Sequence, residues 1–355
     1  MADIFDNFSS LTLNAEEAYS DSELIKVNPY VTPEVQNVHA AHTGVVMDKF
    51  IPILGQFEDI GLADPKSCGV NTVTDAFPVS EKKWEPKLFS SRIPICIDDL
   101  PALFKAWRES QIASKRWENI ENPMKQFVMD RAQQAVTRAI IRIAEFSDKA
   151  AAVVGSGGNF TAGTVIGLFN VIDGMWAQIF ADDAGAKLIH RYTIAENAKA
   201  TKTEQLALAA DAAYNVFDDL TVNLPAEAMG GNNVIQCTKS LWDNWVKYIE
   251  SKAGAYRPEL MQDGMTKETF RGFKLVVRYD WDRLIKKYHD LGTTYYLPHR
   301  AIITDLNNIP VGTSDTQSFT TLDAFYDKTD KKYYIDVAWR EDMKLLQESL
   351  IAVAY

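Results

Sequence analysis

The stretch NPMKQFVMDRAQQAVTRAIIRIAEFSDK, residues 122–149, carries the strongest helical pattern in the chain. Asn122-Pro123 is typical of a helix start, because a proline in the first turn has no N–H to leave unsatisfied. The apolar side chains that follow recur every three or four residues. They are Met124, Phe127, Val128, Ala132, Ala135, Val136, Ala139, Ile140, Ile143 and Ala144. The pattern predicts one amphipathic helix over about 122–149, which would span about 40 Å at about 1.5 Å per residue.

The chain before this helix is interrupted by proline and has little core of its own. Residues 1–64 contain Pro29, Pro33 and Pro52, so an extended arm is expected there. Residues 65–97 place proline, glycine and asparagine between β-type residues, which predicts a long two-stranded excursion. A further helix is expected from Asp98-Asp99, with Pro101 in its first turn.

The chain after the long helix mixes helical and strand patterns. A glycine-rich turn is expected over 155–159. The expected elements after it are an apolar helical stripe over 165–180, a helix over 203–217, a strand over 232–238, a helix over 240–254, and strands over 273–279, 301–304, 333–339 and 349–355. This mixture predicts an α+β chain.

Composition excludes several classes of protein. The 355 residues include 48 Asp and Glu against 37 Lys and Arg, a net charge of −11. A protein that wraps nucleic acid needs concentrated positive charge to displace counterions from phosphates, so general DNA or RNA binding is not indicated. No apolar run is long enough to predict a membrane span or a signal peptide. Cys68, Cys96 and Cys237 lie far apart, which argues against a zinc site and a disulfide framework.

The patterns that could carry chemistry are weak. Gly158 and Gly163 have the spacing of a phosphate-binding loop, but Thr164 stands where such a loop needs lysine. His39 and His42 lie three residues apart with no third metal donor close in sequence, which favours a surface or interface pair. No catalytic, cofactor-binding or metal-ligating residue is therefore assigned.

Seven short motifs, taken in order across most of residues 60–355, resemble one family. They are Lys83–Lys87 followed by Arg92–Cys96, Asn122–Phe146, Gly157–Asn159 followed by Gly167–Asn170, Asn233–Thr238 followed by Trp242–Tyr248, Phe270–Val277, Ala301–Thr304 with Asn308–Thr313, and Ala352–Tyr355. Each motif is weak alone, and their order carries the weight. The chain resembles the major capsid proteins of tailed bacteriophages, which have the Hong Kong 97-type capsid fold.

The resemblance implies a division of the chain. It implies an N-terminal arm over 1–64, an E-loop hairpin over 65–97, a peripheral domain with the spine helix over 98–165, a mainly axial domain over 166–310, and a return to the peripheral domain with a C-terminal strand over 311–355. No fused scaffolding segment precedes the arm, so a separate scaffold or none is implied. Some relatives cross-link a lysine to an asparagine, but no asparagine partner is recognised here and no cross-link is assigned.

The resemblance also implies a function. Hexamers and pentamers of the chain would form an icosahedral head that encloses double-stranded phage DNA without sequence-specific binding. A portal protein, with separate scaffolding or decoration proteins, would be its partners. It would assemble in the bacterial host cytoplasm and remain in the virion, with no cofactor, no membrane contact and no enzyme activity. A bacterial nanocompartment shell of the same fold is the alternative, and an α+β enzyme with an unrecognised site is a more distant one.

Residues 82–92 are the candidates for contact between subunits. A two-stranded hairpin is marginal by itself in water, so it must lie on something. In a monomeric enzyme that would be its own body, and in a shell it would be a neighbouring subunit whose acidic surface meets the basic side chains. Aromatic side chains in such places often anchor interfaces. The predicted contact residues are Lys82, Lys83, Trp84, Lys87, Phe89 and Arg92.

Overall fold

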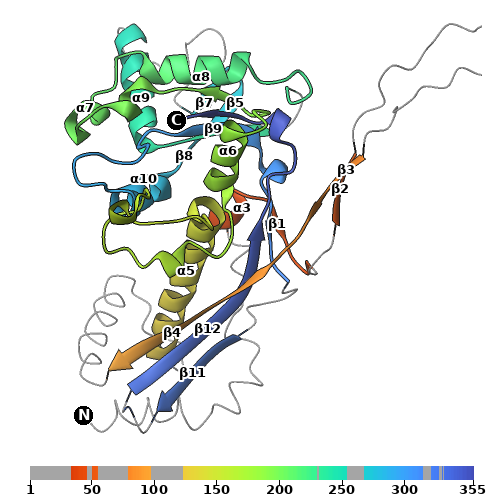
Figure 1. Ribbon diagram of the computed structural model, residues 1–355, viewed down its shortest axis with the longest axis vertical. Helices are drawn as coiled ribbons and strands as arrows, with labels where there is room; N and C mark the ends of the chain where they lie inside the picture. Colours follow the sequence, from red (N-terminus) through yellow and green to blue (C-terminus); the bar gives the residue numbers. More distant parts are fainter. Residues whose placement is uncertain are drawn as a thin grey trace, which may run out of the picture. The chain divides into compact units, whose positions relative to one another are not determined.

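The structure is a computed structural model, and two compact units make up the chain (Figure 1). It describes residues 33–45, 50–54, 79–96, 123–229, 232–253, 268–314, 321–327, 330 and 332–355. Unit 1 comprises Met1–Val45, Pro86–Glu145 and Val311–Asp342, and unit 2 comprises Val46–Glu85, Phe146–Pro310 and Met343–Tyr355. Each unit is therefore built from segments that are distant in sequence.

Unit 1 contains the predicted long helix, α5 (Pro123–Phe146). Its buried residues include Ala132, Val136, Ile140 and Ile143, which lie on the predicted apolar stripe. The helix ends at Phe146 and not at Lys149. The Asp148 carboxylate accepts a hydrogen bond from the backbone N–H of Ala150 at 2.7 Å, which forms a turn where the helix was expected to continue.

The sheet of unit 1 is centred on β12 (Lys332–Met343). On one side β12 pairs antiparallel with β11 (Thr321–Asp327), and on the other side with β4 (Lys87–Cys96), so that the three long strands lie side by side (Figure 1). The short strands β1 (Ala41–His42) and β10 (Val311–Gly312) pair parallel with each other and complete the sheet. A one-turn helix, α3 (Pro33–Gln36), precedes β1.

Unit 2 contains a six-stranded mixed sheet in the order β5-β13-β9-β6-β8-β7. Its strands are β5 (His190–Tyr192), β6 (Asn233–Cys237), β7 (Thr269–Phe270), β8 (Phe273–Val277), β9 (Ala301–Asp305) and β13 (Ala352–Ala354). The C-terminal strand β13 lies between β5 and β9. The last segment of the chain, expected to return to the domain of the long helix, therefore returns only as far as Asp342, and 343–355 complete the other unit.

Two layers of helices cover this sheet. The helices are α6 (Met175–Ala184), α7 (Lys202–Leu206), α8 (Ala212–Val222), α9 (Lys239–Ala253) and α10 (Tyr279–Tyr288). Figure 1 shows α8 and α9 on one face, where Phe217, Trp245 and Phe270 meet edge to face. Trp176 of α6 and Trp281 of α10 pack edge to face in a second aromatic cluster, with centroids 5.2 Å apart. Among the described helices, none is both long and apolar enough to cross a membrane.

A buried cation lies in that second cluster. The Arg300 guanidinium is fully buried against the rings of Trp176 and Phe146, at 4.9 and 5.2 Å from their centroids. It donates to the carbonyl of Leu297 at 2.9 Å. Burial lowers the pKa of Arg300 to about 10, so it stays charged at neutral pH, where the ring faces and carbonyls take the place of a carboxylate.

Two helices expected from the sequence are shorter than predicted. The stripe over 165–180 divides into a 3-10 turn, Ile166–Leu168, and α6, because Gly174 is extended and caps α6. The helix over 203–217 divides into α7 and α8, where the Asn244 side chain donates to the carbonyl of Ala209 at 2.7 Å and accepts from the N–H of Ala213 at 3.0 Å. Helix α10 was not predicted, although it has aspartates in its first turn and lysines in its last, an arrangement that favours a helix.

The two-stranded excursion has different bounds from those predicted. Strand β3 (Val79–Lys83) pairs antiparallel with β2 (Phe50–Leu54), before the predicted range of 65–97, and forms a separate ribbon in unit 2. Strand β4 lies inside that range but pairs with β12, more than two hundred residues later. The helix expected from Asp98, most of the arm, and the chain between β2 and β3 lie outside the described residues.

Candidate intersubunit site

The six predicted contact residues divide between two sheets. Lys82 and Lys83 end strand β3, and Trp84 follows them in unit 2. Lys87, Phe89 and Arg92 belong to strand β4 in unit 1. The structure therefore does not place them on one sheet, and their common role in contacts between subunits stays a prediction.

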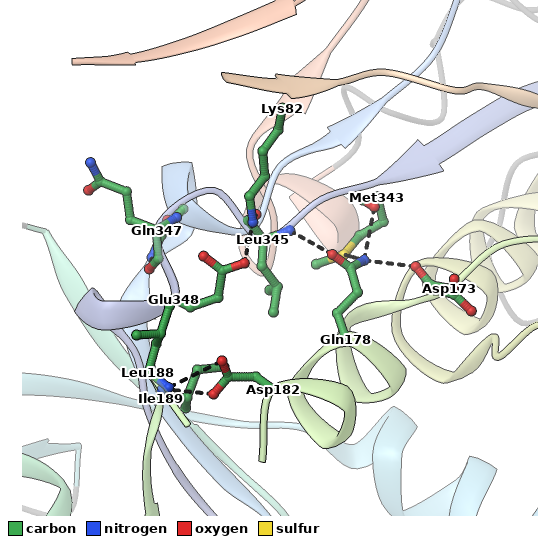
Figure 2. Close-up of polar contacts among 11 residues, drawn as sticks. Lys82, Asp173, Gln178, Asp182, Leu188, Ile189, Met343, Leu345, Gln347 and Glu348 are labelled. Carbon is green, nitrogen blue, oxygen red and sulfur yellow. Dashed lines mark hydrogen bonds and ion pairs between the residues drawn. The ribbon is translucent and has the colours of Figure 1, made fainter. Parts of the chain in front are cut away.

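Lys82 has its acidic partner in its own chain. Its ammonium group donates to the carbonyl of Leu345 at 2.5 Å and forms an ion pair with the Glu348 carboxylate (Figure 2). The two charged side chains are only 28% and 26% exposed. The acidic surface that the sequence predicted on a neighbouring subunit is thus supplied, for this lysine, by the segment that leads to the C-terminal strand.

That segment, residues 344–351, joins β12 to β13, and we call it the connector. The Gln178 side chain on α6 holds one end, because its amide N–H donates to the Met343 carbonyl at 3.0 Å and its amide oxygen accepts from the N–H of Leu345 at 3.1 Å (Figure 2). Asn308 holds the middle of the connector with two bonds to the Gln347 backbone, of 2.7 and 2.8 Å. The segment that carries the acceptors of Lys82 is therefore held by bonds that do not involve the lysine.

The turn next to the connector is fixed as well. The Asp182 carboxylate accepts from the backbone N–H groups of Leu188 and Ile189, at 3.2 and 2.9 Å (Figure 2). These bonds hold the chain between α6 and β5. Side-chain bonds to the backbone thus hold both segments of unit 2 that lie next to Lys82.

Trp84 and Lys83 differ sharply in exposure. The indole of Trp84 is 4% exposed within its own chain, and its role as an interface anchor stays a prediction. The side chain of Lys83 is exposed. Successive side chains of a strand point to opposite faces, so Lys82 turns toward the connector and Lys83 away from it.

Two of the three residues on β4 contact the side chain directly opposite them on β12. Phe89 stacks on Trp339, directly opposite it on β12, with centroids 5.8 Å apart. Arg92 binds Asp336, also directly opposite, through two bonds of 2.7 and 2.6 Å, and this holds the pKa of Asp336 below its usual range. Lys87 is half-buried. These contacts fix the register of β4 on β12.

The histidine pair and the glycine-rich stretch have structural roles. His39 is buried and bonds Glu145 at 3.1 Å, whereas His42 is exposed. Gly157 adopts a left-handed φ of 81°, and a side chain at Gly158 would collide with the Ala152 carbonyl, so a tight turn explains these glycines. Across the described residues there is no group of three or more His, Cys, Asp or Glu that could hold a metal ion.

Ser240 lines a cavity of about 550 Å³ in unit 2 and lies close to the buried His299. The hydroxyl of Ser240 lies 2.6 Å from Nδ1 of His299, and Nε2 of that histidine lies 2.7 Å from the Gln205 carbonyl. Burial lowers the pKa of His299, so the neutral ring accepts from the serine and donates to the carbonyl. A catalytic relay needs an acceptor that stabilises the charged ring, and a carbonyl does this poorly. The arrangement therefore holds two segments together.

The wall of the cavity defines no ligand class. It mixes lysines 239, 247 and 286 with aspartates 243 and 282. Lys239 already pairs with Asp243, and the Asp282 carboxylate accepts from the backbone N–H of Lys239 at 2.7 Å. We assign no ligand to it.

The fold is similar to that of solved phage structures. One, described as the satellite phage P4 procapsid including size determination (Sid) protein, is 10% identical with a TM-score of 0.50, over 91% of this chain and 94% of that chain. A structure from Mycobacterium phage Ogopogo is 12% identical with a TM-score of 0.50, over 91% of each chain. One from Gordonia phage Cozz is 11% identical with a TM-score of 0.50, over 90% of this chain and 84% of that chain.

No protein-family model matches the sequence, and no curated protein matches it. At 10–12% identity the structural likeness shows the fold. It confirms the α+β class and the phage capsid fold that the sequence resemblance implied.

Proposed function

We propose that this chain is the major capsid protein of a tailed bacteriophage. Hexamers and pentamers of it form an icosahedral head around double-stranded DNA. The observation that carries the proposal is the fold shared with the phage P4 procapsid structure over more than nine-tenths of both chains. A likeness over more than nine-tenths of both chains supports a shared architecture and not a shared motif alone.

The charge of the chain suits a container. A net charge of −11 gives the subunit no general attraction for phosphates, so the shell encloses DNA without gripping it. We assign the chain no catalytic role, cofactor or sequence-specific DNA contact. In this proposal its partners are copies of itself, a portal protein, and any separate scaffolding or decoration protein. It assembles in the bacterial host cytoplasm and ends in the virion.

Electron microscopy of the purified chain, alone and mixed with a phage lysate, tests this function. Closed particles of uniform size, with DNA inside those that form in the lysate, are expected. Closed particles that hold protein cargo and never DNA would favour a nanocompartment shell of the same fold. Monomers under every condition, or tight binding of duplex DNA at 200 mM salt, would contradict the proposal.

The β2–β3 ribbon is proposed to lie on a neighbouring subunit. Because Leu54 and Val79 face each other across the ribbon, a short Gly-Ser turn can replace residues 55–78 and leave the ladder intact. The shortened chain is expected to melt like the wild type and to form no closed shells. Normal particles from this deletion would show that the excursion does not connect subunits.

A further inference from the structure

We propose that Lys82 is a positioning residue that sets the direction of the β2–β3 ribbon within unit 2. Its effect on shell formation rests on the function proposed above, whereas its effect on the ribbon does not. The juxtaposition that carries the inference is a lysine near the end of β3, bonded to a connector that two amide side chains hold in place.

The ribbon needs an external support. Strand β3 has five residues, and among the described strands its ladder joins it to β2 alone. Two-stranded ribbons are marginally stable in water by themselves. The buried indole of Trp84 fixes the point at which the chain leaves β3, but a single point does not set the direction of a strand. The bonds of Lys82, two residues earlier, supply a further fixed point.

The connector can supply this further fixed point because two side chains, Gln178 and Asn308, bond its backbone. Gln178 bonds the backbone at both Met343 and Leu345. Asn308 bonds both backbone groups of Gln347, one residue before Glu348. A preorganised acceptor loses less freedom when the bond forms, so the lysine is held in one direction.

Salt can weaken the ion pair between Lys82 and Glu348. The Lys82 and Glu348 side chains keep about a quarter of their surface in water, so salt screens the pair in part. Salt weakens the hydrogen bond to the uncharged Leu345 carbonyl less than it weakens the ion pair. This bond therefore keeps the lysine in place when the ion pair weakens. Loss of Glu348 should therefore cost less than loss of Lys82.

Three variants of the full chain separate these contributions. Lys82→Met keeps the aliphatic stem and loses both bonds, and Glu348→Gln loses the ion pair but keeps the carbonyl contact. Lys83→Met is the matched control, because the adjacent exposed lysine lies on the opposite face of the strand. The first readout is hydrogen exchange of residues 79–83 in the unassembled subunit, and the second is electron microscopy of the assembled product.

We expect the ribbon amides of Lys82→Met to exchange about tenfold faster, which corresponds to about 1.4 kcal/mol of local stability. Glu348→Gln should fall between this variant and the wild type, and Lys83→Met, which keeps both bonds of Lys82, should exchange more slowly than Glu348→Gln. The melting temperature should change little in all three. Only the Lys82 variant should then give mainly open or irregular assemblies.

The outcomes distinguish the two proposals. Wild-type exchange in Lys82→Met would overturn the positioning role even if the wild type forms shells. Faster exchange in that variant, with a wild type that never assembles, would support the positioning role and contradict the proposed function. A mobile ribbon that still gives normal closed shells would overturn the link between ribbon direction and assembly.

Discussion

Strands β3 and β4 are separated by three residues, yet they are held in different ways. All ten residues of β4 pair with β12, and Phe89 and Arg92 each contact the side chain directly opposite. Strand β3 pairs with the five residues of β2 and bonds the connector through Lys82. Two lysine-bearing strands that are neighbours in sequence therefore differ in how firmly they are held, because they differ in the number of residues paired with another strand.

The two strands also use the same kind of ion pair for different purposes. Arg92 and Asp336 lie 244 residues apart in sequence on the open face of a long ladder, where they add to a register already fixed. Lys82 and Glu348 lie where little ladder is available, so the pair sets a direction. What an ion pair contributes to the placement of a strand therefore depends on the other contacts that hold that strand.

The largest expected effect breaks the attachment of β4. Trp339 is buried opposite Phe89, so Trp339→Ala removes a large core side chain and should lower the free energy of unfolding by about 3–5 kcal/mol. Urea titration followed by circular dichroism measures this. Leu88→Ala, at a 57% exposed position of β4, is the control and should cost less than about 0.5 kcal/mol. Equal losses in the two variants would contradict the inward placement of Trp339.

A smaller effect on stability, which depends on pH, is expected at Glu341. This residue of β12 pairs with the first residue of β4. Burial raises the pKa of Glu341 well above its usual range, although the Trp339 indole N–H and the charge of Arg142 oppose this, and Asp342 adds to it. The folded chain therefore holds this proton more tightly than the unfolded chain. Ionisation of Glu341 costs stability progressively as the pH rises above about 4.5.

Glu341→Gln cannot ionise, so its stability relative to the wild type should rise with pH. We expect melting temperatures that agree near pH 4.5 and a variant that melts at a higher temperature than the wild type at pH 7. Thermal melts between pH 4.5 and 7.5 measure the difference. A difference that stays constant with pH, or that shrinks as the pH rises, would contradict the buried, proton-holding carboxyl.

The smallest expected effect is at the exposed pair on β4. A double-mutant cycle of Arg92→Ala and Asp336→Ala should give a coupling of about 0.2–1 kcal/mol that falls at high salt, because exposed pairs are well solvated. A coupling above about 2 kcal/mol would show that this pair, and not the ladder, holds β4 in register.

Sequence alone determined the parts of this protein that depend on local periodicity. The apolar stripe from Ala132 to Ala144 predicted α5, because a helix buries one face at a fixed spacing, and the strand-like residues of 232–238 and 301–304 predicted the positions of β6 and β9. The ordered motifs implied the phage capsid fold, which the structural likeness confirms. The basic residues of 82–92 were also identified as a group, since composition is visible without a partner.

Only the tertiary structure decided what each of those residues meets. Strand pairing is non-local, so nothing near β4 in the sequence identifies β12 as its partner, and the ribbon was predicted with the wrong bounds. The burial of Trp84 and the bond from Lys82 to the connector likewise depend on segments that are distant in sequence. Helices α6 and α8 start where Gly174 and Asn244 place them, against a helical pattern that continued across both breaks. Local propensity is a weak preference, and tertiary contacts override it wherever they supply more free energy.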